Sequence, residues 1–482
     1  MDADTRTIIL IDDDVAPGRA VRVNDDDDDA VPALQEILAI DERMARTTRK
    51  LEAEFAYVDT KIHRFPRGLR GIDGGDGDGG RYIAPSVVAI GPYHHGAARL
   101  QDMEEVKLAA AYHLCRSSGH STAKVYERVR SVAGAARGCY AAADPSVEGV
   151  GEADFTAMMF LDGCFLLQYM VDGEDAAPVL RNRMTLSTGP SIQKDIFLLE
   201  NQIPWLVLEV LAEFISVDVH RFVHDMGAKF LPGKAMAKSE NGRRRLPWPW
   251  GCTCTGGRAT KPADRSRGGE QQYKPAHLLG LLRFTQVGSM PEDMVKYKAF
   301  PLSLSSSAVE LAEIGVVPTP STEQWFGDAR VRRCGLAGEL LLSPVFLSEV
   351  TACWLVNMAA LEASTAGASR DSDGFVVSSY LSVLAMLVDR KEDVHELRRR
   401  RVLHGALSNK QALGFFKGLG QHLRFGGRYF AALEGIDSYK RHRSLRIAAH
   451  KFVYNNYRFI AAFLSVTGVL IGIFKTLLSL KR

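Results

Sequence analysis

Apolar residues recur along this chain mostly with the spacing of α-helices, at every third or fourth position, rather than with the alternation of β-strands. Two helices are predicted within residues 100–140, separated near residues 117–119, where Ser-Ser-Gly interrupts the pattern. Further helices are predicted at residues 154–171, after Ser191 with a restart at Pro204, after Pro275, after Ser307, and at about 347–363, 375–389 and 409–419. Residues 340–346 fit a short strand or an extended segment. The pattern therefore predicts a mostly α fold, a single large helical domain with long surface loops.

The chain divides by composition into segments of different character. Residues 1–30 contain ten aspartates and three arginines, which predicts a disordered acidic tail. Residues 31–439 carry the helical pattern, interrupted by a glycine-rich stretch at 71–80 and by an insert at 234–274 with ten basic and three acidic residues. We predict both as flexible surface loops. The early apolar run is too short, and its surroundings too acidic, for a signal peptide.

The last apolar segment, residues 459–480, predicts a transmembrane helix. It contains one charged residue, Lys475, and 22 residues rise about 33 Å, enough for a hydrocarbon core of about 30 Å. A terminal helix buried in the protein core is the alternative. The basic residues within 440–458 indicate a juxtamembrane segment and a cytosolic body, on the plasma membrane or an endomembrane. The expected anchor, which would contact membrane lipid, includes Phe459, Leu464, Leu470, Ile473 and Leu480.

Composition excludes several classes of protein. Hydrophobic residues make up 46% and charged residues 24% of the 482 residues, which is typical of a folded globular body and excludes a disordered chain. The seven cysteines include no C-x-x-C pair, which argues against a disulfide scaffold and a standard zinc module. The net charge of +3 arises from the insert and the C-terminal tail, so we expect no nucleic-acid partner.

Candidate chemistry is sparse. Adjacent histidines at 94 and 95 could contribute to a metal site, but no further ligands follow at a suitable spacing, which favours a structured turn. Asp162 and Glu200 are acids within apolar segments, where a raised pKa can serve catalysis. Capping a neighbouring helix or pairing with an internal arginine is the more common role of such acids. The chain lacks the phosphate-binding loop, nucleophile elbow, zinc-protease and kinase motifs. We expect no cofactor, no metal and no enzymatic activity.

Several long motifs in this chain resemble the plant "domain of unknown function 247" family. They include Val88-Ala-Ile-Gly-Pro-Tyr-His-His-Gly96, Met159-Phe-Leu-Asp-Gly-Cys-Phe-Leu-Leu167 and Asp195-Ile-Phe-Leu-Leu-Glu-Asn-Gln-Ile-Pro-Trp205, in the family's order. The motif residues singled out here are Gly91, Pro92, Tyr93, His94, His95, Gly96, Asp162, Gly163, Cys164, Glu200, Asn201, Gln202, Pro204 and Trp205.

The resemblance implies a mostly helical land-plant protein with a C-terminal membrane segment and no established activity. It also suggests recognition, because some grass members are linked to pollen self-incompatibility. Our leading hypothesis is thus a membrane-anchored recognition or signalling-associated protein that binds another protein. The alternative is a membrane-tethered enzyme that uses His94 and His95 with Asp162 or Glu200. Convergence of His94, Asp162 and Glu200 in one deep polar pocket would favour the enzyme.

Overall fold

The structure is a computed structural model, and it separates into two units, residues 1–58 and 59–482. It describes residues 39–49, 51–52, 60–73, 80–141, 144–171, 188–231, 273–288, 306–321, 326–334, 337–365, 375–423, 426–442 and 444–480. In the first unit, the described residues are helical and exposed. The predicted acidic tail lies outside the described residues, as do nearly all of the basic insert and residues 74–79 of the glycine-rich stretch.

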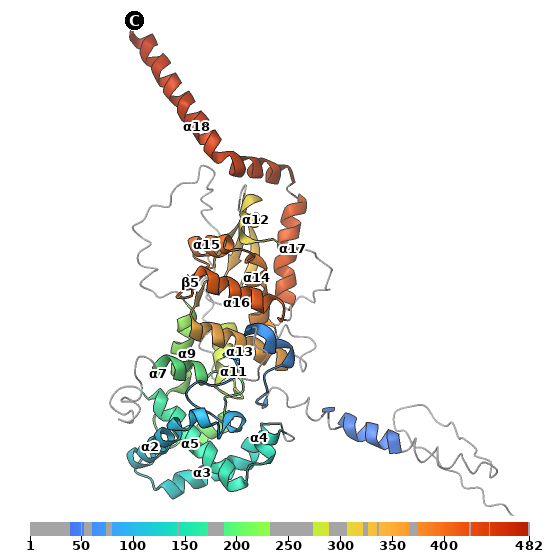
Figure 1. The fold of residues 1–482 in the computed structure, drawn as a ribbon, viewed down its shortest axis with the longest axis vertical. Coiled ribbons are helices and arrows are strands. Elements are labelled where there is room, and N and C mark those ends of the chain that lie inside the picture. Colours follow the sequence, from blue (N-terminus) through green and yellow to red (C-terminus); the bar gives the residue numbers. More distant parts are fainter. Residues whose placement is uncertain are drawn as a thin grey trace, which may run out of the picture. The chain divides into compact units, whose positions relative to one another are not determined.

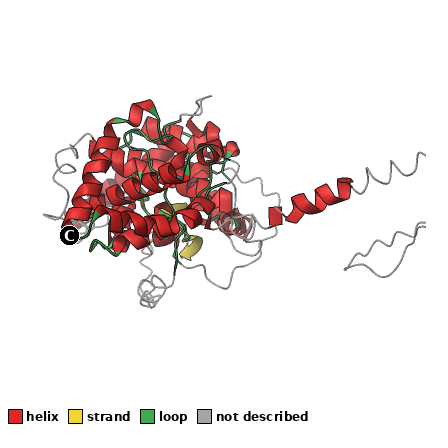
Figure 2. Cartoon of the chain, turned by 90° about the horizontal axis from the view of Figure 1, so that it is seen from below, coloured by secondary structure: helices red, strands yellow, loops and turns green. Residues whose placement is uncertain are grey.

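Helices dominate the second unit, as the sequence pattern predicts (Figures 1 and 2). In its first half, α5 lies in the centre and packs against α2, α3 and α8. Ser121 caps the start of α3 by accepting a hydrogen bond from the backbone N–H of Lys124. The helices of this half are α2 (Asp102–Ser117), α3 (Thr122–Gly138), α4 (Pro145–Glu148), α5 (Glu152–Met170), α7 (Thr188–Asp195), α8 (Trp205–Ala212) and α9 (Val219–Gly227).

The second half continues with helices that pack around α13 and α14. Both are buried along most of their length, since their sequences are apolar nearly all round. A capping box at Ser307 and Glu310 starts α12, as its spacing predicts, and Gly315 follows with a positive φ of 83°. The helices are α11 (Leu278–Val287), α12 (Ala308–Glu313), α13 (Glu349–Thr365), α14 (Val376–Leu387), α15 (Lys391–Arg399), α16 (Asn409–Gly420), α17 (Gly427–His442) and α18 (Ser444–Leu480).

Two small sheets interrupt the helices, and the sequence pattern indicated only part of them. β3 (Ala337–Leu342) lies in the middle of a three-stranded sheet, parallel to β1 (Val316–Pro320) and antiparallel to β2 (Ala329–Cys334). β4 (Val345–Leu347) pairs in parallel with β5 (Leu403–Gly405), far away in sequence. Residues 340–346 are thus the end of one strand and the start of another. The pairing of β1, β2 and β5 depends on tertiary contacts that short-range periodicity does not encode.

The predicted helix across residues 196–203 is wrong. Helix α7 ends at Asp195 and α8 begins only at Trp205, so the buried residues between them are not helical. The amide side chains of Asn201 and Gln202 bind backbone groups here, which offers the chain an alternative to the helical hydrogen bonds. Pro204 also disfavours a helical residue before it. Leu198 and Leu199 are buried, and Trp205 is half-buried.

The predicted transmembrane helix is also wrong. In the part of the chain that the structure describes, no helix has the length and apolar character needed to cross a membrane. Helix α18 runs 37 residues, so the apolar segment is the second part of a longer helix whose first part contains Arg446, Lys451 and Arg458.

The predicted single-pass membrane location with a cytosolic body is wrong for the same reason, because it depended on that helix. Phe459, Leu464, Leu470 and Ile473 do not form the expected anchor, and neither does Leu480 at the end of α18. The alternative of a helix buried in the core does not describe this segment either. The side chains of Phe459, Leu464, Leu470 and Ile473 are 79%, 63%, 60% and 52% exposed. In the predicted juxtamembrane segment, Lys440 belongs to α17 and donates to the Ser306 hydroxyl at 2.7 Å.

Candidate functional site

The histidine motif, residues 91–96, forms a tight turn that begins in the core and ends at the protein surface. Pro92–His94 is a single turn of 3-10 helix, preceded by Gly91 with a φ of 75°. A Cβ at position 91 would collide with the backbone oxygen of Gln202, so both the conformation and the close approach require glycine. Tyr93 is buried, and its hydroxyl donates to the Ile62 carbonyl at 2.9 Å.

His94 and Glu200 meet at the edge of this turn. The Nε2 atom of His94 lies 3.8 Å from Oε2 of Glu200, and the two side chains are 13% and 4% exposed. Burial, together with the positive charges of Arg64 and Arg99, lowers the pKa of His94 to about 4. The imidazole is therefore neutral near pH 7. Nε2 makes no hydrogen bond among the described residues, and His95 next to it is exposed.

Glu200 is held by groups from the N-terminal part of the unit. Its Oε2 atom accepts from Arg64 at 2.9 Å, and its Oε1 atom accepts from the backbone N–H of Phe65 at 2.7 Å. Arg64 also binds both oxygens of Asp144, at 2.7 and 2.8 Å, and lies 3.9 Å above the ring of Tyr93. Burial disfavours the charged guanidinium, but the hydrogen bonds to Asp144 and Glu200 outweigh it and raise the pKa of Arg64.

Asp162 belongs to a second, more deeply buried set of contacts. It pairs with Lys107 at 2.7 Å, and the two side chains are 2% and 0% exposed. Its other oxygen accepts from the backbone N–H of Gly91 at 2.7 Å, while Lys107 also binds Glu104 at 2.7 Å. Burial opposes the ammonium, but these two carboxylates outweigh burial and raise the pKa of Lys107. An acid from α5 thereby joins α2 to the histidine turn.

The three candidate catalytic residues thus converge only in part. His94 and Glu200 touch, but Asp162 lies on the inner side of the turn with Lys107, and all three belong to internal contacts. They do not line the pocket of about 350 Å³ that the structure contains elsewhere. Among the described residues, no group of three or more His, Cys, Asp or Glu side chains is placed to hold a metal ion. Cys252 and Cys254 lie outside the described residues.

Comparison with known proteins now identifies the family that these motifs suggested. A sequence model of a family described as plant protein of unknown function, DUF247, matches residues 62–471. This chain belongs to the DUF247 family. A relative from Arabidopsis thaliana, UPF0481 protein At3g47200, is 24% identical over 378 residues, which cover 71% of this chain and 69% of the relative. No solved structure matches the chain.

The remaining motif residues of this DUF247 chain have packing and backbone roles. Asn201 accepts from the Ile90 N–H at 2.7 Å and donates to the Val88 carbonyl at 3.0 Å, which holds the backbone just before the turn. Gln202 accepts from the Leu279 N–H at 3.1 Å, and so attaches the start of α11. On α5 and α8, Gly163 allows close packing, Cys164 is fully buried, and Pro204 precedes the first residue of α8, Trp205.

Sequence reasoning missed the partners of these acids. The signal for Lys107 was present, since it falls on the apolar face of α2, three residues after Glu104, where an unpaired ammonium would be costly. Asp195 is a further buried carboxylate, and it accepts the backbone N–H groups of residues 86–88 at 2.6 to 3.1 Å. Nothing in the local pattern distinguishes such a backbone-binding acid from a catalytic one.

Proposed function

We propose that this DUF247 chain is a recognition protein, which acts by binding another protein rather than by catalysing a reaction. One observation carries the proposal. Asp162 and Glu200, the two acids whose chemistry suggested catalysis, are occupied by internal ion pairs and backbone hydrogen bonds that connect α2, α5 and the histidine turn. Recognition of the kind found in the self-incompatibility members of the family would be one case.

Satisfied charges of this kind argue for a structural role. A catalytic acid or base must reach its substrate directly or through one water. Lys107 and Asp162 are fully buried, and both oxygens of Glu200 already accept from Phe65 and Arg64. The enzyme hypothesis would need these contacts to break before substrate could bind.

Proximity labelling in plant cells tests the proposal, with tagged wild-type chain compared with His94→Asn. His94 is the suitable residue because its Nε2 atom makes no hydrogen bond among the described residues, so the change leaves the network intact. We expect both chains to label the same proteins, and at least one purified candidate to bind the purified chain directly with micromolar affinity or better. His95→Asn, at an exposed neighbouring position, is the matched control.

Two results would overturn the proposal. One is that no labelled protein binds the purified chain directly. The other is turnover of a compound in plant extract by the wild-type chain and the His95→Asn control that is lost in His94→Asn.

A further inference from the structure

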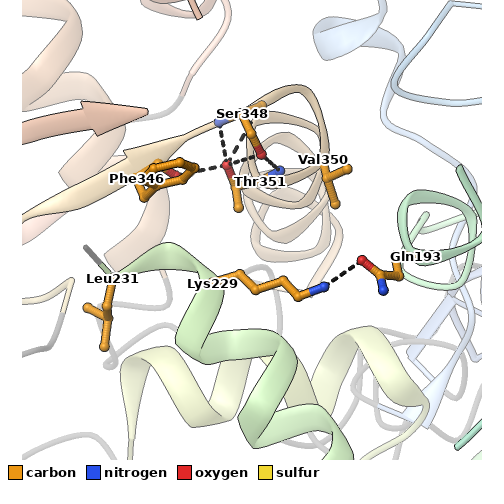
Figure 3. Close-up of a pocket in the computed structure, with 7 residues that line it drawn as sticks. All are labelled: Gln193, Lys229, Leu231, Phe346, Ser348, Val350 and Thr351. Atoms are coloured by element: carbon orange, nitrogen blue, oxygen red, sulfur yellow. Dashed lines mark hydrogen bonds between the residues drawn. The ribbon is translucent and has the colours of Figure 1, made fainter. Parts of the chain in front are cut away.

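A pocket of about 350 Å³ lies between segments that are far apart in sequence, and none of the family motifs explains it. Figure 3 shows the side chain of Lys229 extended along the pocket toward Gln193, with Phe346 and Val350 on the opposite side. Its other lining residues are Leu231, Ser348 and Thr351. Although four of the lining residues are polar, the surface that the lining exposes to the pocket is largely apolar. The volume falls within the usual range of sites for small molecules.

The pocket residues are held in place by the core behind them. Lys229 belongs to a short 3-10 helix, Ala228–Phe230, whose Phe230 is fully buried against the rings of Phe326 and Trp354. Trp354 also donates through Nε1 to the Gln193 carbonyl at 3.0 Å. Because these anchors fix the backbone on both sides, the pocket exists without a ligand, and little ordering is needed to bind one.

Lys229 is the charged group in this pocket, and its charge is not neutralised within the described residues. Its ammonium donates to the Gln193 side-chain oxygen, a neutral partner, at 2.5 Å (Figure 3). No carboxylate of the described residues pairs with it, in contrast to Lys107, which has two. Lys229 is half-buried, and burial lowers its pKa. A partly desolvated ammonium gains more from an anion than an exposed one does.

We propose that this pocket binds a small organic carboxylate with an apolar body, whose carboxylate pairs with Lys229 while its body packs against Phe346 and Val350. A carboxylate fits better than a phosphate, because the pocket offers a single cation, and phosphate sites in proteins usually combine several charged donors. This site is separate from the charged network around Glu200, and it goes beyond the proposed recognition of a protein.

Calorimetric titration of the full chain tests the proposal with two probes, 4-phenylbutyrate and its neutral analogue 4-phenylbutanamide. They share an apolar body and differ in charge, so their affinity ratio measures the contribution of the ammonium. We expect the carboxylate to bind at one site, at least tenfold more tightly than the amide. Lys229→Met should remove that tenfold preference, whereas Lys229→Arg should keep most of it.

Matched variants separate this site from other apolar surfaces. Lys124→Met removes an exposed lysine on α3 and should leave both affinities unchanged. Val350→Trp should fill the pocket and abolish binding of both probes, and thermal unfolding confirms that each variant is folded. The proposal is wrong if wild-type chain does not bind 4-phenylbutyrate at millimolar concentration, if acid and amide bind equally, or if folded Lys229→Met retains the preference. None of these outcomes bears on the direct binding of a partner protein.

Discussion

Helices α5 and α18 have similar apolar character and opposite surroundings. In α5, fourteen of 19 residues are buried, including an acid, Asp162. In α18, the apolar residues from Phe459 to Ile473 with described side chains are mostly exposed. The difference is in their neighbours. Four helices, α2, α3, α8 and α9, pack against α5, whereas α18 contacts α12 and α17 and packs Ile447, in its first part, against the core.

The comparison shows that hydropathy measures how strongly a segment avoids water, but not which surface covers it. Hydropathy alone is compatible with either a core helix or a membrane span for both segments. For α5, the buried Lys107 decided between them, because it supplies the charge that Asp162 needs in an apolar surrounding. Matched substitutions in the two helices test this difference.

The largest expected difference concerns the charged residue within each helix. Asp162→Ala leaves the buried Lys107 ammonium and the Gly91 N–H without this partner, and should lower the free energy of unfolding by about 3–5 kcal/mol. Lys475→Ala, at an exposed position on α18, should change it by less than about 0.5 kcal/mol. Urea unfolding measures both.

The double variant Asp162→Leu with Lys107→Met is the control for this experiment. It removes both charges together, so it should be more stable than Asp162→Ala. Equal stability of wild type and Asp162→Ala would show that the pair does not hold α2 to α5.

Phenylalanines allow the same comparison for packing. Phe165 on α5 is fully buried, so Phe165→Ala should cost about 3–5 kcal/mol in urea unfolding. Phe463 on α18 is 70% exposed, and Phe463→Ala should cost less than about 0.5 kcal/mol. A loss at Phe463 as large as that at Phe165 would mean that α18 is packed against a surface of the chain.

Acid should weaken the buried region through His94. Its pKa is about 4 in the folded chain and near 6.5 when unfolded, so the unfolded state takes up the proton first as pH falls. The free energy of unfolding should therefore decline from about pH 6.5 to pH 4, by on the order of 3 kcal/mol in total. His94→Asn should remove this part of the pH dependence. His95→Asn should not, and identical profiles for wild type and His94→Asn would contradict the expectation.

Replacing glycines by alanine should give the smallest changes in stability, and the changes in α5 and α18 should have opposite signs. A Cβ at Gly163 would collide with a methyl group of Leu211 and crowd Val207, so Gly163→Ala should destabilise the chain by about 1–2 kcal/mol. A Cβ at Gly468 or Gly472 of α18 meets nothing within 4 Å. Alanine there should stabilise α18 by up to about 1 kcal/mol, because it has the higher helix propensity. Circular dichroism during thermal unfolding distinguishes the two signs.

Much of the helical framework could be predicted from sequence, because it depends on interactions between residues close in the chain. The division between α2 and α3, the capping box at Ser307 and the start of α11 follow from local spacing and cap residues. The family could also be recognised from its motifs, and the comparison confirms it. Residues 196–203 show the limit of such reasoning, since their apolar spacing fits a helix while their amide side chains bind the backbone instead.

The candidate site was predicted only as a set of residue types. The sequence identified His94, Asp162 and Glu200 as unusual, but not that Asp162 pairs with Lys107 or that Glu200 binds Arg64, 136 positions away. The pocket around Lys229 left no signal, because its lining comes from three segments that are far apart in the sequence. Local propensities and apolar spacing act over a few residues, so the sequence by itself determined most of the helices and the family. Charge pairing, burial and pocket shape depend on which distant segments meet. Only the tertiary structure decided which segments those are.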